Sequence, residues 1–158
     1  MKHPKSFIRV KAILILFLIF PFYSCSFRSE PEKIWNLRGK IVALAESLRG
    51  IPYHYGGTDI DGFDCSGFVN YLYDSFGVDI PRTAKKQGRI KTRIKLKYAK
   101  QGDILVFRIK RNQWHSGIFI SKKYFIHSPN GRGVVRREKY TKYWKKRIKY
   151  TISLLDDV

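Results

Sequence analysis

Three residues of this sequence have the chemistry of a thiol nucleophile with its base: Cys65, His115 and His127. A thiol needs a base within hydrogen-bond reach, and the base needs a third group that fixes its tautomer, before the set can carry out acyl transfer. Taken singly, a cysteine is more often an inert buried thiol and a lone histidine on a strand is more often structural. Two of the four histidines fall on one predicted hairpin, however, which favours a shared function.

The thiol lies where a helix is predicted to begin. Asp64 is a favourable N-cap, and a helix-ending Gly77 follows apolar residues that recur at helical spacing, namely Phe68, Val69, Leu72, Tyr73 and Phe76. The positive end of a helix dipole stabilises a thiolate, so we expect the pKa of Cys65 to be lowered. That shift would make Cys65 a nucleophile.

The two histidines are predicted to meet on a β-hairpin. Residues 113–121 and 124–127 have the pattern of two strands with a turn between them, so positions whose numbers sum to about 242 to 245 lie opposite each other. His115 then comes within a residue or two of His127, and the two-residue period of strands allows both imidazoles to point to the same side. Gly117 leaves space beside them.

The elements that must position these residues predict a single α+β domain at 33–158. An amphipathic helix is expected from Ile34 to Leu48 with a stop at Gly50, Thr83 could cap another short helix, and the glycine-rich loop 51–64 is a place for function. Strands are expected at 103–109, 113–121, 123 or 124 to 127, and 146–155. Helices come first and an antiparallel sheet follows, which is typical of α+β proteins.

The N-terminus has the pattern of an export signal. Basic residues precede an apolar run of eleven residues from Ala12 to Phe22, which is too short to span a bilayer but matches the core of a signal peptide. Residues 1–24 therefore resemble a lipoprotein signal, with Cys25 as the acylated first mature residue and 25–32 as a short tether. An ordinary cleaved signal and an uncleaved anchor are the alternatives.

The charge points to an anionic partner. The formal net charge is +20, and loss of four basic residues with residues 1–24 would leave 20 − 4 = +16. Cell-wall polymers and phospholipid surfaces are anionic, and the basic residues are scattered, so we do not expect nucleic acid. The sequence contains no His-x-x-His or Cys-x-x-Cys spacing, so we expect no metal site.

Five segments together resemble the NlpC family, also called NlpC/P60, of papain-like bacterial cell-wall peptidases. They are GIPYHYGGTDIDGFDCSGF at 50–68, IPRTAKKQ at 80–87, GDILVF at 102–107, HSGIFIS at 115–121 and YFIHSPNGRGV at 124–134. Their order and spacing match the family throughout, and the resemblance extends from about Ile34 to Leu155. It implies a papain-like fold with N-terminal helices on an antiparallel sheet.

The resemblance also implies roles for individual residues. Cys65 matches the nucleophile, whose backbone amide contributes to the oxyanion hole; His115 matches the general base; and His127 matches the group that orients the base. Tyr53 matches a tyrosine that lines the site. Asp64 and Ser66 match positions that bind substrate in some relatives. Arg82 could meet a substrate carboxylate, although a solvated arginine is an equally good interpretation.

The function expected from the resemblance is hydrolysis of peptide bonds in peptidoglycan through a thioester, without a cofactor. The bond is either the cross-link between stem peptides or the one from D-glutamate to the diamino acid. We expect a monomer in the cell envelope, held to a membrane by a lipid on Cys25. The alternatives are a catalytically silent wall-binding lipoprotein and an amidase or acyltransferase on the same scaffold.

Overall fold

The computed structural model describes residues 37–130 and 133–155 of the chain. The chain divides into two units, Met1–Pro31 and Glu32–Val158, and every described residue belongs to the second. The predicted signal, Cys25 and the tether lie outside the described residues. Within the part that is described, none of the helices is long and apolar enough to cross a membrane.

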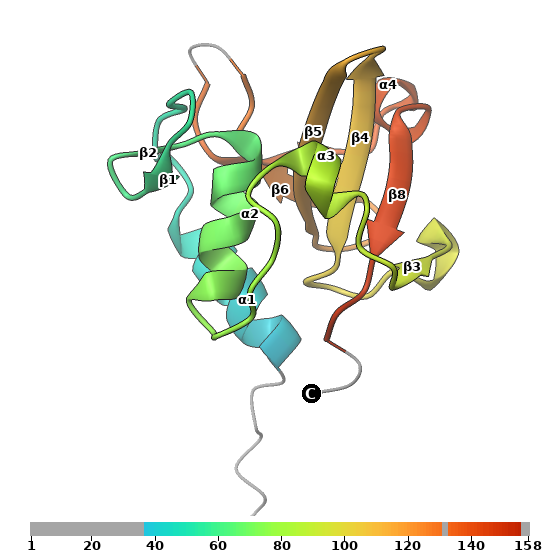
Figure 1. Ribbon diagram of the computed structural model, residues 1–158, viewed down its shortest axis with the longest axis horizontal. Helices are drawn as coiled ribbons and strands as arrows, with labels where there is room; N and C mark the ends of the chain where they lie inside the picture. The colour runs from blue at the N-terminus through green and yellow to red at the C-terminus, as the bar shows by residue number, and fades with distance from the viewer. Residues whose placement is uncertain (1–36, 131–132, 156–158) are drawn as a thin grey trace, which may run out of the picture. The chain divides into compact units, whose positions relative to one another are not determined.

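The domain contains four α-helices, one 3₁₀ helix and eight strands among the described residues (Figure 1). The helices are α1 (Leu37–Ser47), α2 (Cys65–Asp74), α3 (Ala84–Gln87), η1 (Leu96–Tyr98) and α4 (Lys142–Lys145). The strands are β1 (Thr58–Asp59), β2 (Gly62–Phe63), β3 (Arg93–Ile94), β4 (Ile104–Lys110), β5 (Gln113–Phe119), β6 (Tyr124–His127), β7 (Arg136–Lys139) and β8 (Ile148–Ile152).

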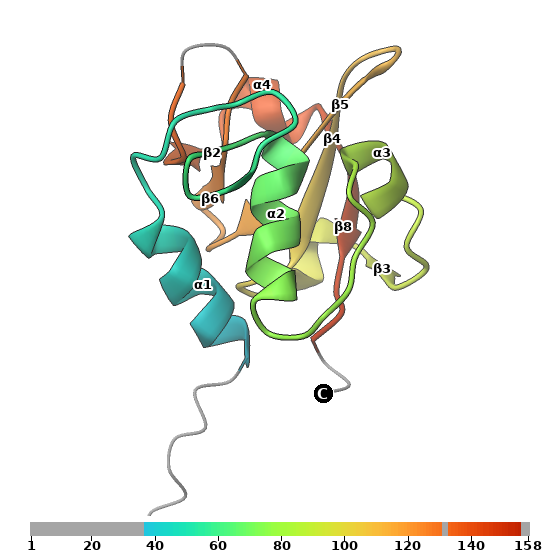
Figure 2. The ribbon, with the colours of Figure 1, turned by 60° about the vertical axis from the view of Figure 1, so that its left-hand side comes forward.

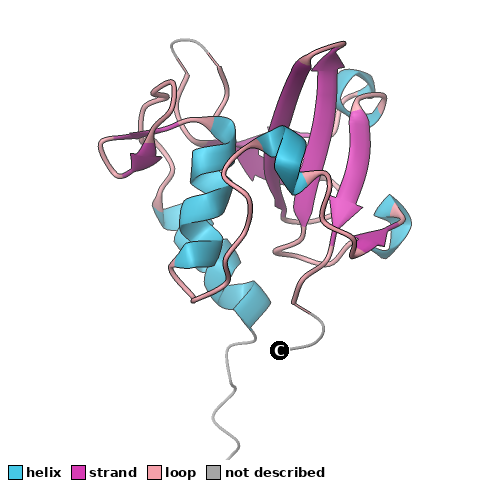
Figure 3. Cartoon of the chain, in the orientation of Figure 1, coloured by secondary structure: helices cyan, strands magenta, loops and turns pink. Residues whose placement is uncertain are grey.

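Six strands form one antiparallel sheet in the order β3-β8-β4-β5-β6-β7, and β1 and β2 form a separate small hairpin. The helices α1 and α2 lie together on one side of the sheet (Figures 2 and 3). Helices therefore precede an antiparallel sheet along most of the chain, which confirms the α+β prediction.

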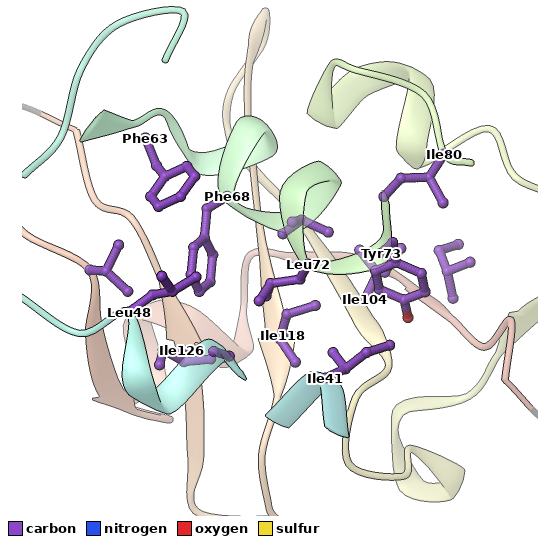
Figure 4. Close-up of a cluster of buried hydrophobic side chains, with 14 of the residues drawn as sticks. Ile41, Leu48, Phe63, Phe68, Leu72, Tyr73, Ile80, Ile104, Ile118 and Ile126 are labelled. Atoms are coloured by element: carbon purple, nitrogen blue, oxygen red, sulfur yellow. The ribbon is translucent and has the colours of Figure 1, made fainter. Parts of the chain in front are cut away.

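The main core lies between the helices and the sheet (Figure 4). Ile41 of α1 and Phe68 and Leu72 of α2 meet Ile118 and Ile126 of the sheet, and all five are fully buried. Each such side chain contributes about 1.5–3 kcal/mol when removed from water. A second cluster covers the other face of the sheet, where Leu105, Phe107, Phe119 and Phe125 are buried and Trp144 of α4 packs against them.

The start of α2 follows the sequence prediction. Asp64 caps the helix, because its Oδ1 accepts a hydrogen bond of 2.6 Å from the backbone amide of Gly67. The helix gives way to a turn after Asp74, and Gly77 has a positive φ of 73° that a side chain would disfavour. Thr83 caps α3 as expected.

The expected strands exist, but two further strands of the sheet were not predicted. β3 has only two residues, too few to show alternation. β7 has the sequence RREK, and it lies at the edge of the sheet with three exposed side chains, so it lacks the apolar pattern that marks a strand. The predicted strand 146–155 is shorter in the structure, where β8 covers Ile148–Ile152.

A buried ion pair joins α1 to the segment before β4. Arg38 Nη1 lies 2.6 Å from Asp103 Oδ1, with side-chain exposures of 3% and 0%. Arg38 also donates to Ser153 Oγ, which follows β8, and Asp103 Oδ2 accepts from the backbone amide of Lys100. Burial of both charges is costly unless these hydrogen bonds are made, so the pair fixes the position of α1 against the sheet.

We predict that Asp103→Ala lowers the free energy of unfolding by about 3–5 kcal/mol, because it removes a fully buried carboxylate that accepts from the guanidinium of Arg38 at 2.6 Å. Urea unfolding followed by circular dichroism measures the change. Glu46→Ala is the matched control, since it removes the carboxylate of the exposed pair with Arg137 and should cost about 0–1 kcal/mol. Equal losses of unfolding free energy in the two variants would contradict a special contribution of the buried pair Arg38–Asp103 to stability.

Candidate active site

Cys65 is a free cysteine at the first residue of α2, and it is 8% exposed. Burial raises the pKa of its thiol, the backbone amide of Ser116 lowers it, and the charge of Asp64 raises it again, with a net increase. The expectation of a lowered pKa was therefore wrong. The helix dipole is outweighed because the thiol is desolvated and the capping carboxylate lies beside it.

Asp64 holds the start of α2 in place through its hydrogen bonds. Arg82 donates to both of its carboxylate oxygens, at 3.0 and 2.8 Å, and Ser66 Oγ donates to Oδ1 at 3.1 Å. Although burial raises the pKa of Asp64, the hydrogen bonds and charge of Arg82 and the amide of Gly67 hold it below its ordinary value. Asp64 is thus charged and paired at neutral pH.

Arg82 ties the glycine-rich loop to the start of α2. Besides Asp64 it donates to Ser66 Oγ at 3.1 Å and to the backbone carbonyls of Gly56 and Gly57 at 2.8 and 3.3 Å. A Cβ on Gly67 would lie only 2.0 Å from the carbonyl oxygen of Gly57, so the loop approaches α2 as closely as a glycine allows. A substrate carboxylate would have to compete with these partners for Arg82.

The structure brings the two histidines into contact, as the hairpin prediction required. Ile118 pairs with Ile126 and Phe119 with Phe125, and His115 Nε2 lies 2.6 Å from His127 Nδ1. Gly117 makes this possible, because a Cβ there would be 2.7 Å from the carbonyl oxygen of Ile126 and 3.0 Å from the Cβ of His127. The two rings are perpendicular, with an interplanar angle of 89°.

Aromatic rings surround the histidine pair and keep it neutral. His115 and His127 are 5% and 0% exposed and lie against Phe107, Phe125 and Trp144. Burial lowers the pKa of His115 to about 4, although the charge of Asp64 acts the other way. Burial also lowers the pKa of His127, and the charges of His115 and Arg136 lower it further.

Ser116 connects the thiol to the candidate base His115. Its backbone amide is a hydrogen-bond donor to Cys65 that favours the thiolate, and its hydroxyl lies 3.4 Å from the carbonyl oxygen of Cys65. His115 is the adjacent residue, and because His127 occupies its Nε2, only Nδ1 is left to receive a proton from the thiol. Within 37–130 and 133–155, no hydrogen bond joins the thiol to either imidazole. The raised pKa of the Cys65 thiol and the lowered pKa of His115 keep both groups neutral at rest.

A cleft of about 670 Å³ opens onto the thiol, a size suited to a small ligand or a peptide side branch. The residues predicted to contact substrate all line this cleft, namely Tyr53, Asp64, Ser66 and Arg82. Cys65, Tyr55, Trp114 and neighbouring residues complete its wall. Burial and the charges of Cys65 and Asp64 raise the pKa of Tyr53, so its phenol stays protonated beside the thiol. The two histidines line a smaller adjacent cavity of about 150 Å³.

Sequence reasoning missed three residues that support the site. Ser116 could have been found, since it follows the candidate base directly. Gln87, fully buried, donates to the carbonyl of Ser66 at 3.2 Å, and Trp144 packs on the histidines from α4. Gln87 ends the segment 80–87 that the sequence had singled out, but nothing local shows that its side chain reaches Ser66. Trp144 carries no local signal, because it reaches the histidines from a segment distant in the sequence. In the described part of the chain, no cluster of three His, Cys, Asp or Glu side chains could hold a metal ion.

The comparisons with known proteins agree on one family. The NlpC/P60 family model matches residues 50–152. The chain is 34% identical over 142 residues to the probable endopeptidase NlpC of Escherichia coli (strain K12), covering 84% of this chain and 92% of that protein. It is 30% identical over 113 residues to the same organism's murein DD-endopeptidase MepS/murein LD-carboxypeptidase, covering 71% of this chain and 60% of that protein.

Two further matches extend the comparison. The chain is 36% identical over 106 residues to the gamma-D-glutamyl-L-lysine dipeptidyl-peptidase of Bacillus cereus, covering 65% of this chain but only 32% of that protein. The crystal structure of the NlpC/p60 domain of the peptidoglycan hydrolase SagA superposes with a TM-score of 0.65 at 31% identity, covering 74% of this chain and 98% of that domain.

We predict that the free energy of unfolding falls as the pH drops from about 6.5 to about 5. The folded state holds the histidine pair neutral, whereas unfolded histidines bind protons near their ordinary pKa of 6.5. The unfolded state therefore binds more protons in this window, and each buried histidine can contribute about 1.4 kcal/mol per pH unit. Urea unfolding at several pH values measures the slope.

His127→Leu should reduce this slope, because one of the two buried imidazoles is gone. His54→Gln changes an exposed histidine and serves as the control that should keep the slope of the parent protein. A slope that His127→Leu leaves unchanged would show that the pair is not the source of the acid sensitivity.

Proposed function

Because the chain belongs to the NlpC/P60 family, we propose that it is a cysteine endopeptidase that hydrolyses peptide bonds of bacterial peptidoglycan. The observation that carries the proposal is the arrangement at the cleft. A free thiol at the start of α2 lies beside the backbone of Ser116, and the adjacent His115 is in contact with His127. This order of thiol, base and orienting group is the one that thiol-dependent acyl transfer requires.

In the first half-reaction, His115 Nδ1 takes the proton of the Cys65 thiol, and the sulfur attacks the carbonyl carbon of the scissile amide. The C–N bond then breaks, the imidazolium returns its proton to the leaving amine, and a thioester remains on Cys65. In the second half-reaction, His115 takes a proton from water, the hydroxide attacks the thioester, and Cys65 leaves with a proton. The products are a carboxylic acid and an amine.

The backbone amide of Cys65 is the proposed oxyanion donor. It is the first amide of α2 and has no hydrogen-bond partner among the described residues, because Asp64 caps the amide of Gly67 instead. One such donor contributes about 3–4 kcal/mol to transition-state stabilisation in analogous reactions. The phenol of Tyr53 stays protonated on the same wall and is available as a second donor.

The site also bears on which bond is cut. In an enzyme that recognises the free amine of a stem peptide, a carboxylate near the thiol must accept a hydrogen bond from that amine. Both oxygens of Asp64 already accept from Arg82, so an incoming amine has to share this carboxylate. We therefore propose the cross-link between stems as the substrate, as the name of the relative MepS indicates for that enzyme, with the bond after D-glutamate as the alternative.

The place of action follows from the substrate and from the N-terminal pattern. We propose that the protein acts in the cell envelope as a monomeric lipoprotein that residues 1–24 export and that a lipid on Cys25 anchors to a membrane. After the loss of residues 1–24 the net charge of 20 − 4 = +16 would still hold the enzyme near anionic polymers of the wall, since attraction of this kind acts over about 10 Å at moderate salt. A catalytically silent wall-binding lipoprotein remains the competing interpretation.

We predict that the protein degrades purified peptidoglycan under reducing conditions and that Cys65→Ala abolishes the activity, with a loss of at least 10³-fold because no nucleophile remains. Mass analysis of the released muropeptides identifies which peptide bond is cut. Loss of cross-linked dimers with intact stems identifies the cross-link as the target, whereas shortened stems identify the bond after D-glutamate. Identical profiles for the parent protein and Cys65→Ala would favour the wall-binding interpretation.

We also predict that Cys25→Ser abolishes incorporation of radioactive palmitate in cells, because the serine hydroxyl replaces the thiol that is acylated. Cys65→Ser is the matched control, since it changes the other cysteine and should leave labelling intact. Labelling that persists in Cys25→Ser would show that residues 1–24 are not a lipoprotein signal.

A further inference from the structure

One nitrogen of the histidine pair is buried without a hydrogen bond. His127 Nδ1 faces His115, but His127 Nε2 has no hydrogen-bond partner among the described residues. The carboxylate oxygen Oε2 of Glu138 lies 3.9 Å from this nitrogen, just beyond hydrogen-bond distance. A buried polar atom of this kind is costly and calls for a functional explanation.

We propose that Glu138 is a positioning residue that selects the tautomer of the histidine pair and stabilises the pair when His115 carries the proton of Cys65. The inference rests on the proposed function, because it takes His115 as the base for Cys65. It adds a fourth side chain behind the thiol and the two imidazoles.

The sheet holds Glu138 at this place. β7 pairs with β6 so that Arg136 lies opposite His127 and Glu138 lies opposite Phe125. Because side chains alternate along a strand, Arg136 and Glu138 point to the side of the sheet that carries Phe125 and His127. The side chain of Glu138 is 26% exposed, so its carboxylate is partly shielded from water where it faces the buried ring.

The carboxylate distinguishes two arrangements of protons. Only one proton fits between His115 Nε2 and His127 Nδ1 at 2.6 Å. If His127 carries its proton on Nε2, beside Glu138, then Nδ1 accepts from His115 Nε2–H, and His115 Nδ1 is left as a free base. In the other arrangement His127 donates from Nδ1 and His115 carries its proton on Nδ1, where it cannot accept one from the thiol. A negative charge beside Nε2 favours the productive arrangement.

Glu138 also affects the stability of the histidine pair in its protonated, positively charged state. When His115 takes the thiol proton, the pair gains a positive charge in an apolar site, and a carboxylate at 3.9 Å stabilises it. Arg136 acts against this effect. Its Nε and Nη2 both lie 3.1 Å from Oε2 of Glu138, the same oxygen that faces His127. Removing Glu138 and removing Arg136 should therefore shift the basicity of the pair in opposite directions.

The surroundings of the pair contain few other charges. The titratable or charged groups that face it are Cys65 and Asp64 from the start of α2, Arg136 and Glu138 from β7, and Tyr143 from α4. Asp64 is paired with Arg82, as described above. Glu138 is the carboxylate nearest to the outer nitrogen of His127 in the described part of the chain.

The test combines two readouts across pH in the full chain. One is kcat and kcat/KM on cross-linked muropeptides, and the other is the rate at which iodoacetamide alkylates Cys65. Peptide mass spectrometry separates Cys65 from Cys25 in the second readout. It needs no substrate, so it decides the inference even if peptidoglycan is not cut, which would instead refute the proposed function.

Glu138→Leu should lower kcat about tenfold or more, in the range seen when a group that orients a functional histidine is lost. It should also move the acid limb of kcat/KM to lower pH by about half a pH unit or more and slow the alkylation of Cys65 at neutral pH. Glu138→Gln should keep more of kcat, because its amide oxygen still places a partial negative charge near His127 Nε2, yet show the same shift. Arg136→Gln should move the limb to higher pH.

Glu46→Gln is the matched control, since it makes the same chemical change in the exposed ion pair with Arg137, the neighbour of Arg136 on β7. It should leave both readouts unchanged. The inference would be overturned if the Glu138 variants lost activity but kept the acid limb of kcat/KM and the alkylation rate of Cys65 unchanged. Glu138 would then have only a structural role. If Glu138→Leu fails to fold, the opposite shifts of Glu138→Gln and Arg136→Gln decide it.

Discussion

The pairing register of β5 and β6 is the constraint on which the whole site depends. Side chains alternate along a strand, so a slip of one residue would turn His127 to the opposite face of the sheet and separate it from His115. The register is held by Ile118 opposite Ile126, both fully buried under the helices, and by Phe119 opposite Phe125 on the other face. Apolar packing on both faces of one hairpin thus fixes a polar contact of 2.6 Å.

The same packing sets the electrostatics. Rings of Phe107, Phe125 and Trp144 exclude water from the histidines, and burial likewise keeps the thiol of Cys65 protonated at rest. In the proposed reaction, charges therefore form only when a proton moves from sulfur to imidazole, in a place where fixed amides and a carboxylate act strongly because little water screens them. The site differs in this respect from one that stores a thiolate at the helix terminus. Here the helix terminus is already occupied by a capping carboxylate.

Much of this arrangement could be predicted from the sequence because it is encoded locally. The N-cap Asp64, the helix after Cys65 and the hairpin that joins His115 to His127 all follow from patterns within about a dozen residues. The pKa of Cys65 could not be predicted, since it depends on burial by the sheet and on a carboxylate held by Arg82 from another segment. β7 was missed for a related reason: an edge strand of charged residues has no apolar alternation, and so Glu138 had no visible connection to the site.

Rigid support for Cys65 comes from charged side chains that the sequence alone would assign to substrate binding. Arg82 and Asp64 look like free binding groups in the sequence, yet they bind each other, the loop carbonyls of Gly56 and Gly57, and the hydroxyl of Ser66. This network fixes the loop against the first turn of α2, where Gly67 permits an approach that no other residue would. Because Arg82 and Asp64 pair with each other, neither leaves an unpaired charge beside Cys65, although the chain as a whole carries +20. The basic residues can then attract an anionic polymer at long range without placing an unpaired charge beside the sulfur.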